Sequence, residues 1–136
     1  RIVAGDLVEQ GLPFYSGRVT YHLKVGGKIS AGERVFLTFD RFEAACMKIV
    51  SGNRERVMGW RPYEVDATDS IMEDGMVKLE VILTRRNTFG PLHQVPLHTP
   101  AYGPENFVTE GENFSQGYRL IPSGLLSEPG ISVRGE

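Results

Sequence analysis

The sequence has little cysteine and no excess of positive charge, and both shortages exclude classes of protein. Cys46 is the one cysteine among 136 residues, so no disulfide can form within the chain. It lies in an apolar run, where a buried, unreactive thiol is the expected state. The net charge is −2. Nucleic acid is therefore not expected as a partner, because there is no basic excess to displace phosphate counterions.

Long apolar runs, long helical patterns and catalytic fingerprints are missing as well. No apolar run reaches the roughly 20 residues that a transmembrane helix needs, so we expect no membrane partner. No stretch keeps a 3.6-residue period long enough for an ordinary helix. The sequence holds no P-loop, dinucleotide fingerprint or nucleophile elbow. We therefore expect no cofactor and no catalysis by this chain alone.

Glycine and proline are plentiful, at 16 and 8 residues. This composition favours many short elements joined by turns, and hence a β-rich fold. Residues 1–136 are expected to form one domain. Because the chain begins at Arg1 rather than Met, we expect it to be a module of a longer polypeptide.

Alternating apolar and polar residues predict most of the strands. In residues 18–25, Val19, Tyr21, Leu23 and Val25 share one face. Residues 44–50 are apolar on both faces apart from Lys48, which predicts a central strand. In all, the predicted strands are residues 18–25, 34–39, 44–50, 56–60, 63–66, 76–84, 116–121 and 130–134. About eight strands at close spacing predict an all-β fold of the β-sandwich or jelly-roll kind.

The connections between these strands carry clear signals. Ser51-Gly52-Asn53 predicts a turn. One helical turn is predicted at residues 70–73, capped by Thr68 or Asp69 and closed by Asp74-Gly75.

Residues 85–114 have little periodicity, and they contain Phe89, Tyr102, Phe107 and Phe114. A loop of this length is uncommon in a compact domain. We therefore expect it to be functional or docked on a neighbouring surface.

The order of several motifs resembles a known family. The motifs are Phe14–Tyr21, Val35–Phe39, Ala44–Val50, Pro62–Thr68, Leu79–Leu83 and Arg86–Pro91. In this order they resemble the galactose-binding-like jelly rolls of glycoside hydrolases, including the sugar-binding domains of family-two enzymes. The last motif, Arg-Asn-x-x-Gly-Pro, is similar to an element of C-terminal domains in α-L-rhamnosidase-like enzymes. The resemblance implies a non-catalytic accessory module that binds a saccharide or packs on the catalytic domain of the same parent chain.

A cluster of planar donors and rings is the best candidate for carbohydrate binding. It consists of Arg54, Arg56, Trp60, Arg61 and Tyr63. Sugars bind through aromatic platforms under their C–H faces and through planar donors to their hydroxyl groups. The alternative is that Trp60 is a core residue, which is the commoner state of a tryptophan beside a strand.

Asp66, Arg86 and Asn87 are predicted to be structural. Charges at strand ends need partners. We therefore expect Asp66 to pair with Arg86 between two strands, or to cap the following turn. Asn87 is expected to bond loop backbone. A ligand-binding role for the Asp66–Arg86 pair is the alternative.

The remaining polar candidates give weaker signals. His93 and His98 lie five residues apart without a nearby cysteine, so no metal site is expected. A glycosidase needs two carboxylates about 5 to 10 Å apart. No pair has a distinctive spacing among Asp40, Glu43, Asp66, Asp69, Glu73 and Asp74. Two other functions stay open, namely a free-standing lectin-like or adhesion domain and a small independent hydrolase.

Overall fold

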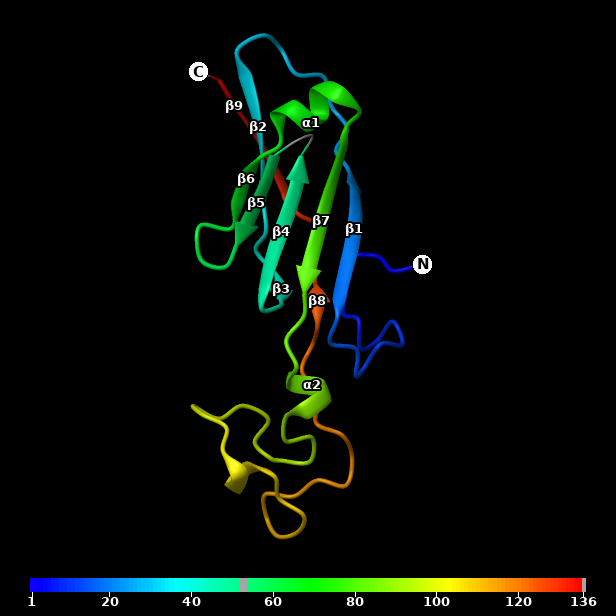
Figure 1. The fold of residues 1–136 in the computed structure, drawn as a ribbon, viewed down its shortest axis with the longest axis vertical. Helices are drawn as coiled ribbons and strands as arrows, with labels where there is room; N and C mark the ends of the chain where they lie inside the picture. The colour runs from blue at the N-terminus through cyan, green and yellow to red at the C-terminus, as the bar shows by residue number, and fades with distance from the viewer. Residues whose placement is uncertain (52–53, 136) are drawn as a thin grey trace.

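The computed structural model describes residues 1–51 and 54–135, which form an all-β sandwich (Figure 1). This confirms the predicted fold class. The strands in the described residues are β1 (Arg18–Lys24), β2 (Glu33–Thr38), β3 (Phe42–Glu43), β4 (Cys46–Ser51), β5 (Arg54–Met58), β6 (Glu64–Asp66), β7 (Met76–Ile82), β8 (Gly124–Leu125) and β9 (Gly130–Gly135). The short helices are α1 (Thr68–Glu73), α2 (Arg86–Phe89) and the 3-10 turn η1 (Pro104–Asn106).

The described strands pair antiparallel in three sheets. The largest has the order β1-β7-β4-β5, the second β6-β2-β9, and a small third sheet joins β3 to β8. In the largest sheet, Leu79 lies opposite Tyr21 on one side and Ile49 on the other. Residues far apart in sequence therefore meet in the middle of this sheet.

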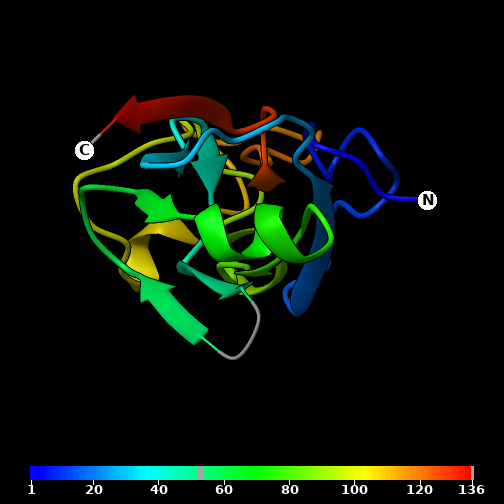
Figure 2. The same cartoon turned by 90° about the horizontal axis from the view of Figure 1, so that it is seen from above.

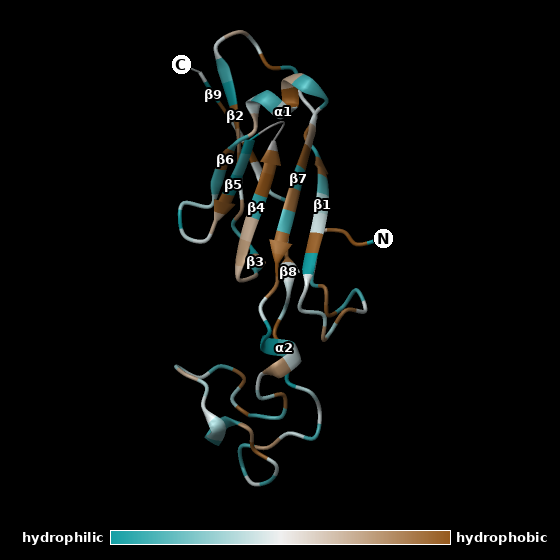
Figure 3. Ribbon diagram, in the orientation of Figure 1, coloured by the Kyte–Doolittle hydropathy of each residue, from teal (hydrophilic) through white to brown (hydrophobic). Residues whose placement is uncertain are grey.

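The core lies between the two larger sheets, where the alternating residues point inward. The four apolar residues predicted to share one face of residues 18–25 are all buried. The apolar residues of β2, β4 and β7 that point into the core are buried as well. The largest buried residues include Leu37, Phe39, Met47, Ile49, Leu79 and Val81. Figure 3 shows hydrophobic and hydrophilic stretches alternating along β1, β4 and β7. Burying each such side chain contributes about 1.5–3 kcal/mol, so this pattern determines the register.

Cys46 is half-buried, so its expected full burial is wrong. Its neighbour Met47 points into the core. Because successive strand residues face opposite sides, Cys46 points away from the core.

Seen from above, α1 lies over the end of the sandwich, between the two larger sheets (Figure 2). Helix α1 includes residues 70–73, so the predicted helical turn is confirmed, but its predicted cap is wrong. The N-cap is Ala67, which makes no side-chain cap hydrogen bond. Thr68 is instead the first helical residue, and its Oγ1 accepts a hydrogen bond from the Val35 N–H at 2.9 Å. Gly75, at φ +71°, ends the helix by donating its N–H to the Ser70 carbonyl at 2.9 Å.

The predicted strand at residues 116–121 is wrong. Residues 116–121 do not form a strand, because their backbone groups bond elsewhere. The Arg119 N–H donates to the Leu92 carbonyl at 2.6 Å, and Ile121 bonds the side chain of Asn87. The predicted turn at 51–53 falls mainly on Gly52 and Asn53, which lie outside the described residues.

Residues 84–122 form a lobe below the sandwich (Figure 1). Its ends meet at Asn87, whose Nδ2 donates to the Ile121 carbonyl at 2.8 Å and whose Oδ1 accepts from the Ile121 N–H at 3.0 Å. Further along, the Val95 N–H donates to the Asn113 carbonyl at 2.8 Å. The segment predicted as a long loop is thus folded by its own hydrogen bonds.

Candidate functional site

The five predicted binding residues lie along one edge of the sandwich. Arg54 and Arg56 belong to β5, the edge strand of the largest sheet. Trp60, Arg61 and Tyr63 lie in the connection from β5 to β6. We call this surface the β5–β6 face.

Trp60 is 80% exposed, so the core alternative for this residue is wrong. The reason lies in the register of β5. Met58, opposite Met47, is buried and fills the last core position of the strand. The chain leaves the sheet at Gly59, so Trp60 lies beyond the core.

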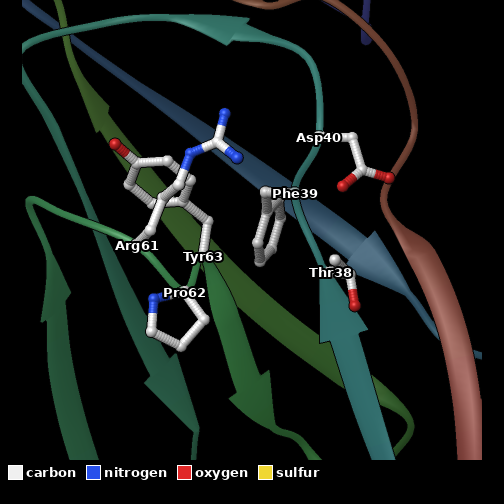
Figure 4. Close-up of a pocket in the computed structure, with 6 residues that line it drawn as sticks. All are labelled: Thr38, Phe39, Asp40, Arg61, Pro62 and Tyr63. Carbon is white, nitrogen blue, oxygen red and sulfur yellow. The ribbon is translucent and has the colours of Figure 1, made fainter.

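The first hollow of this face lies between the end of β2 and the connection to β6 (Figure 4). Its volume is about 490 Å³, and it is lined by Thr38, Phe39, Asp40, Arg61, Pro62 and Tyr63. The Phe39 N–H donates to the Tyr63 carbonyl at 2.9 Å, which holds the two walls together. The Tyr63 ring packs edge-to-face on Phe42, with centroids 4.7 Å apart. This packing holds Tyr63 in place as one wall of the hollow. Arg61 and Asp40, which also line the hollow, carry opposite charges.

Two further hollows continue the same surface. A small one of about 200 Å³ is lined by residues 56–62 and includes Trp60. A larger one of about 420 Å³ is lined by Ile49, Arg54, Glu55, Arg56, Val65, Asp66 and Asp69. Arg61 and Pro62 line the first two hollows, and Arg56 lines the last two. The three hollows are therefore neighbours on this face, and the exposed Trp60 lines the small one that shares residues with both others.

The three arginines of this face differ in whether they form an ion pair with a carboxylate. Arg54 forms an ion pair with Asp69 at 3.1 Å. Within residues 1–51 and 54–135, no ion pair involves Arg56 or Arg61. These two guanidinium groups can donate hydrogen bonds to a ligand.

Asp66 does not pair with Arg86, and this predicted pair is wrong. Asp66 pairs instead with Arg34, while its Oδ1 accepts a hydrogen bond from the Thr68 N–H at 3.0 Å. The two residues are separated because Asp66 ends β6 whereas Arg86 begins α2 in the lobe. Burial alone would raise the pKa of Asp66, but the hydrogen bonds from Thr68 and the charge of Arg34 outweigh it and lower that pKa. The alternative prediction, a carboxylate bonded to the following turn, is confirmed.

Asn87 is buried and bonds the backbone of Ile121, as predicted. The guanidinium of Arg86 has a different environment. It lies over the ring of Tyr102, with Cζ 5.0 Å from the ring centroid.

The histidine at position 93 lies against the backbone of the lobe. His93 Nδ1 lies 2.8 Å from the Ser115 carbonyl oxygen. Among the described residues, no group of three His, Cys, Asp or Glu side chains could hold a metal ion. The same part of the chain contains no helix long and apolar enough to cross a membrane.

Comparison with known proteins bears on the fold alone. No family model matches the chain, and no curated protein matches it. The solved structure of a rhamnosidase from Novosphingobium sp. PP1Y is similar to it, with a TM-score of 0.52 and 20% sequence identity. The similarity covers 89% of this chain but only 11% of the rhamnosidase chain. At this identity it shows a shared β fold that occupies a small part of a glycoside hydrolase.

Proposed function

We propose that this chain is a non-catalytic, carbohydrate-binding accessory module of a glycoside hydrolase, of the galactose-binding-like kind. The observation that carries the proposal is the exposed Trp60, which lines the small hollow beside two larger hollows. An exposed tryptophan is costly in contact with water, and its flat apolar face suits the C–H face of a sugar ring.

The polar groups around Trp60 suit the hydroxyl groups of the same ligand. Arg56 and Arg61 offer planar N–H donors, and Asp40 offers acceptors across the hollow of Figure 4. A sugar hydroxyl both donates and accepts, so it can use both kinds of group. Three neighbouring hollows offer room for more than one sugar unit.

The accessory role draws support from the fold. In the similar rhamnosidase, this fold accounts for 11% of the chain. By analogy, the proposed partner is a catalytic domain in the same polypeptide. The module would hold saccharide near that domain or pack against it.

The lowered pKa values of three carboxylates make these three groups poor candidates for a general acid. A hydrogen bond from Arg134 lowers the pKa of Glu64, one from Lys78 lowers that of Glu80, and the pKa of Asp66 is lowered as well. The general acid of a glycosidase needs a shift in the opposite direction. These carboxylates are suited to remain charged and paired.

A glycan array probed with the purified chain tests the proposal, with calorimetry on each positive glycan. We expect a hit with a dissociation constant below about 1 mM, equivalent to roughly −4 kcal/mol. The chain should not hydrolyse aryl glycosides, including an aryl rhamnoside, at high protein concentration. Turnover of such a substrate would favour the independent hydrolase, and an array without hits would remove the binding role.

A further inference from the structure

A second cleft lies in and beside the lobe, and it shares no lining residue with the three hollows of the β5–β6 face. Its volume is about 690 Å³. Ligand pockets typically measure about 300–1,000 Å³. The rings in its lining are those of Phe89, His98, Tyr102 and Phe107, and the charged side chains are Arg85, Arg86 and Glu43. The cleft therefore combines rings with an excess of positive charge.

Arg86 has a buried guanidinium that lacks hydrogen-bond acceptors. Its Nε, Nη1 and Nη2 are all buried, and none has a partner within the described part of the chain. The Tyr102 ring covers the guanidinium, with 5.0 Å between Cζ and the ring centroid. The N–H donors lie in the guanidinium plane, so a ring stacked over its face does not satisfy them. A buried charge without acceptors is strongly unfavourable, which indicates a missing anionic partner.

A carboxylate is the group that matches this guanidinium. Its two oxygens only accept hydrogen bonds, and they fit the planar fork of arginine. Glu43 lines the same cleft, yet no ion pair in the described part of the chain joins it to Arg86. The N–H donors of Arg86 are thus not used by any acceptor within the described part of the chain.

We propose that this cleft binds an acidic saccharide, with the carboxylate of a uronic acid unit on the edge of Arg86. Phe89 and Phe107 are 67% and 55% exposed, and their rings offer apolar surface for the sugar. Arg85, exposed beside Arg86, adds attraction for the negative charge. Because the Arg86 nitrogens are buried, the side chains around the guanidinium have to shift for a carboxylate to reach its edge. The ion pair that forms is then weakly screened by solvent.

Calorimetric titration at low salt with trigalacturonate and with galactotriose, its neutral counterpart, tests this site. We expect trigalacturonate to bind about tenfold or more tightly than galactotriose, the effect of a charged hydrogen-bonded pair. Arg86→Gln should remove the preference. The control is Arg119→Gln, which removes the same charge from an exposed arginine of the lobe that does not line the cleft, and it should keep the preference.

Three further variants make the result decisive. Glu43→Gln should tighten trigalacturonate binding, because it removes a competing carboxylate from the cleft. Arg86→Lys keeps the charge but loses the planar fork, so it should weaken binding even if Arg86→Gln fails to fold. Met72→Ala, which trims an exposed side chain of α1 that lines neither this cleft nor the hollows of the β5–β6 face, should leave trigalacturonate binding unchanged. Equal affinities for the two trisaccharides, or wild-type binding by a folded Arg86→Gln variant, would overturn the proposal.

Discussion

At the scale of single residues, Asp66 and Arg86 have separate environments, and their partners differ. Asp66 is bonded by Thr68, two positions along the chain, and by Arg34, on a neighbouring strand. Arg86 is stacked on Tyr102, and its hydrogen-bond donors remain unsatisfied among the described residues. The two charges that a sequence argument would pair therefore have separate roles, one in the sandwich and one in the lobe.

Acid should destabilise the fold through its paired carboxylates. The pKa values of Asp66, Glu64 and Glu80 are all lowered in the folded protein. A lowered pKa contributes stability above the unfolded value, and this contribution is lost as the pH falls through the folded value. The unfolded values are near 3.8 for Asp66 and 4.5 for the two glutamates. We therefore expect the melting temperature to fall as the pH drops below about 4.5.

Asp66→Asn isolates one part of this effect. The variant should melt at a lower temperature than wild type at pH 7, and the difference should shrink at pH 3, as measured by circular dichroism. Glu112→Gln, at an exposed carboxylate of the lobe, is the control and should follow the wild type at both values. An Asp66→Asn difference that is the same at pH 7 and pH 3 would show that the Asp66 charge does not stabilise the fold.

Gly124 should not tolerate a side chain. Its φ is +91°, and an added Cβ would lie 2.7 Å from Leu7 Cδ1 and 3.0 Å from the Tyr21 hydroxyl oxygen. Gly124→Ala should lower the free energy of unfolding by about 1–3 kcal/mol in a denaturant titration, through strain and overpacking. Gly117→Ala, at an exposed glycine with open space around it, should have little effect. Equal stability of the two variants would contradict the packing around β8.

At the scale of elements, period-two alternation was sufficient to predict most strands. It identified the inward faces of β1, β2 and β7, because one face of each of these strands is buried in the core. It failed for residues 116–121, where Ile121 is bonded by the side chain of Asn87, 34 residues away in sequence. A partner at that separation leaves no signal in a local pattern.

The candidate site shows the same limit. Arg61 and Tyr63 could be chosen from their chemistry and spacing in the sequence. Thr38, Phe39 and Asp40 were not predicted as site residues, although they form the opposite wall of the hollow in Figure 4. They reach it because Phe39 bonds the carbonyl of Tyr63, a long-range contact at the end of β2. The exposure of Trp60 likewise depends on Met58 filling the last core position of β5.

Asn87 should control the stability of the lobe rather than that of the sandwich. Asn87→Ala leaves the buried backbone N–H and carbonyl of Ile121 without partners, which costs about 1–3 kcal/mol. Hydrogen exchange should accelerate within residues 84–122, while amides of β4 and β7 keep their protection. Asn106→Ala is the comparison: it removes a bond to the Gly103 N–H, 2.6 Å long and local to η1, so its effect should stay near residues 103–106. Uniform acceleration in both regions of the Asn87→Ala variant would show that lobe and sandwich unfold as one unit.

At the scale of the whole molecule, one β-sandwich carries the two separate regions that we propose as binding sites. The β5–β6 face lies along the edge of the sandwich, and the Arg86 cleft lies in and beside the lobe at its lower end. A module of this kind can bind saccharide through one region and use the other for a second ligand or for contact with a neighbouring domain. The sandwich supplies the rigid support that both regions need.

The most direct measurement is calorimetric titration of the best neutral glycan from the array into wild type and Trp60→Ala. Trp60 is 80% exposed, so its removal should cost little stability. Met72→Ala, which trims a 74% exposed side chain on α1, is the control for loss of exposed apolar surface. We predict that wild type and Met72→Ala bind the glycan below about 1 mM. Trp60→Ala should lose binding while its melting temperature stays near that of wild type. Undiminished binding by Trp60→Ala, or a large drop in its melting temperature, would contradict the assignment of Trp60 as the sugar platform.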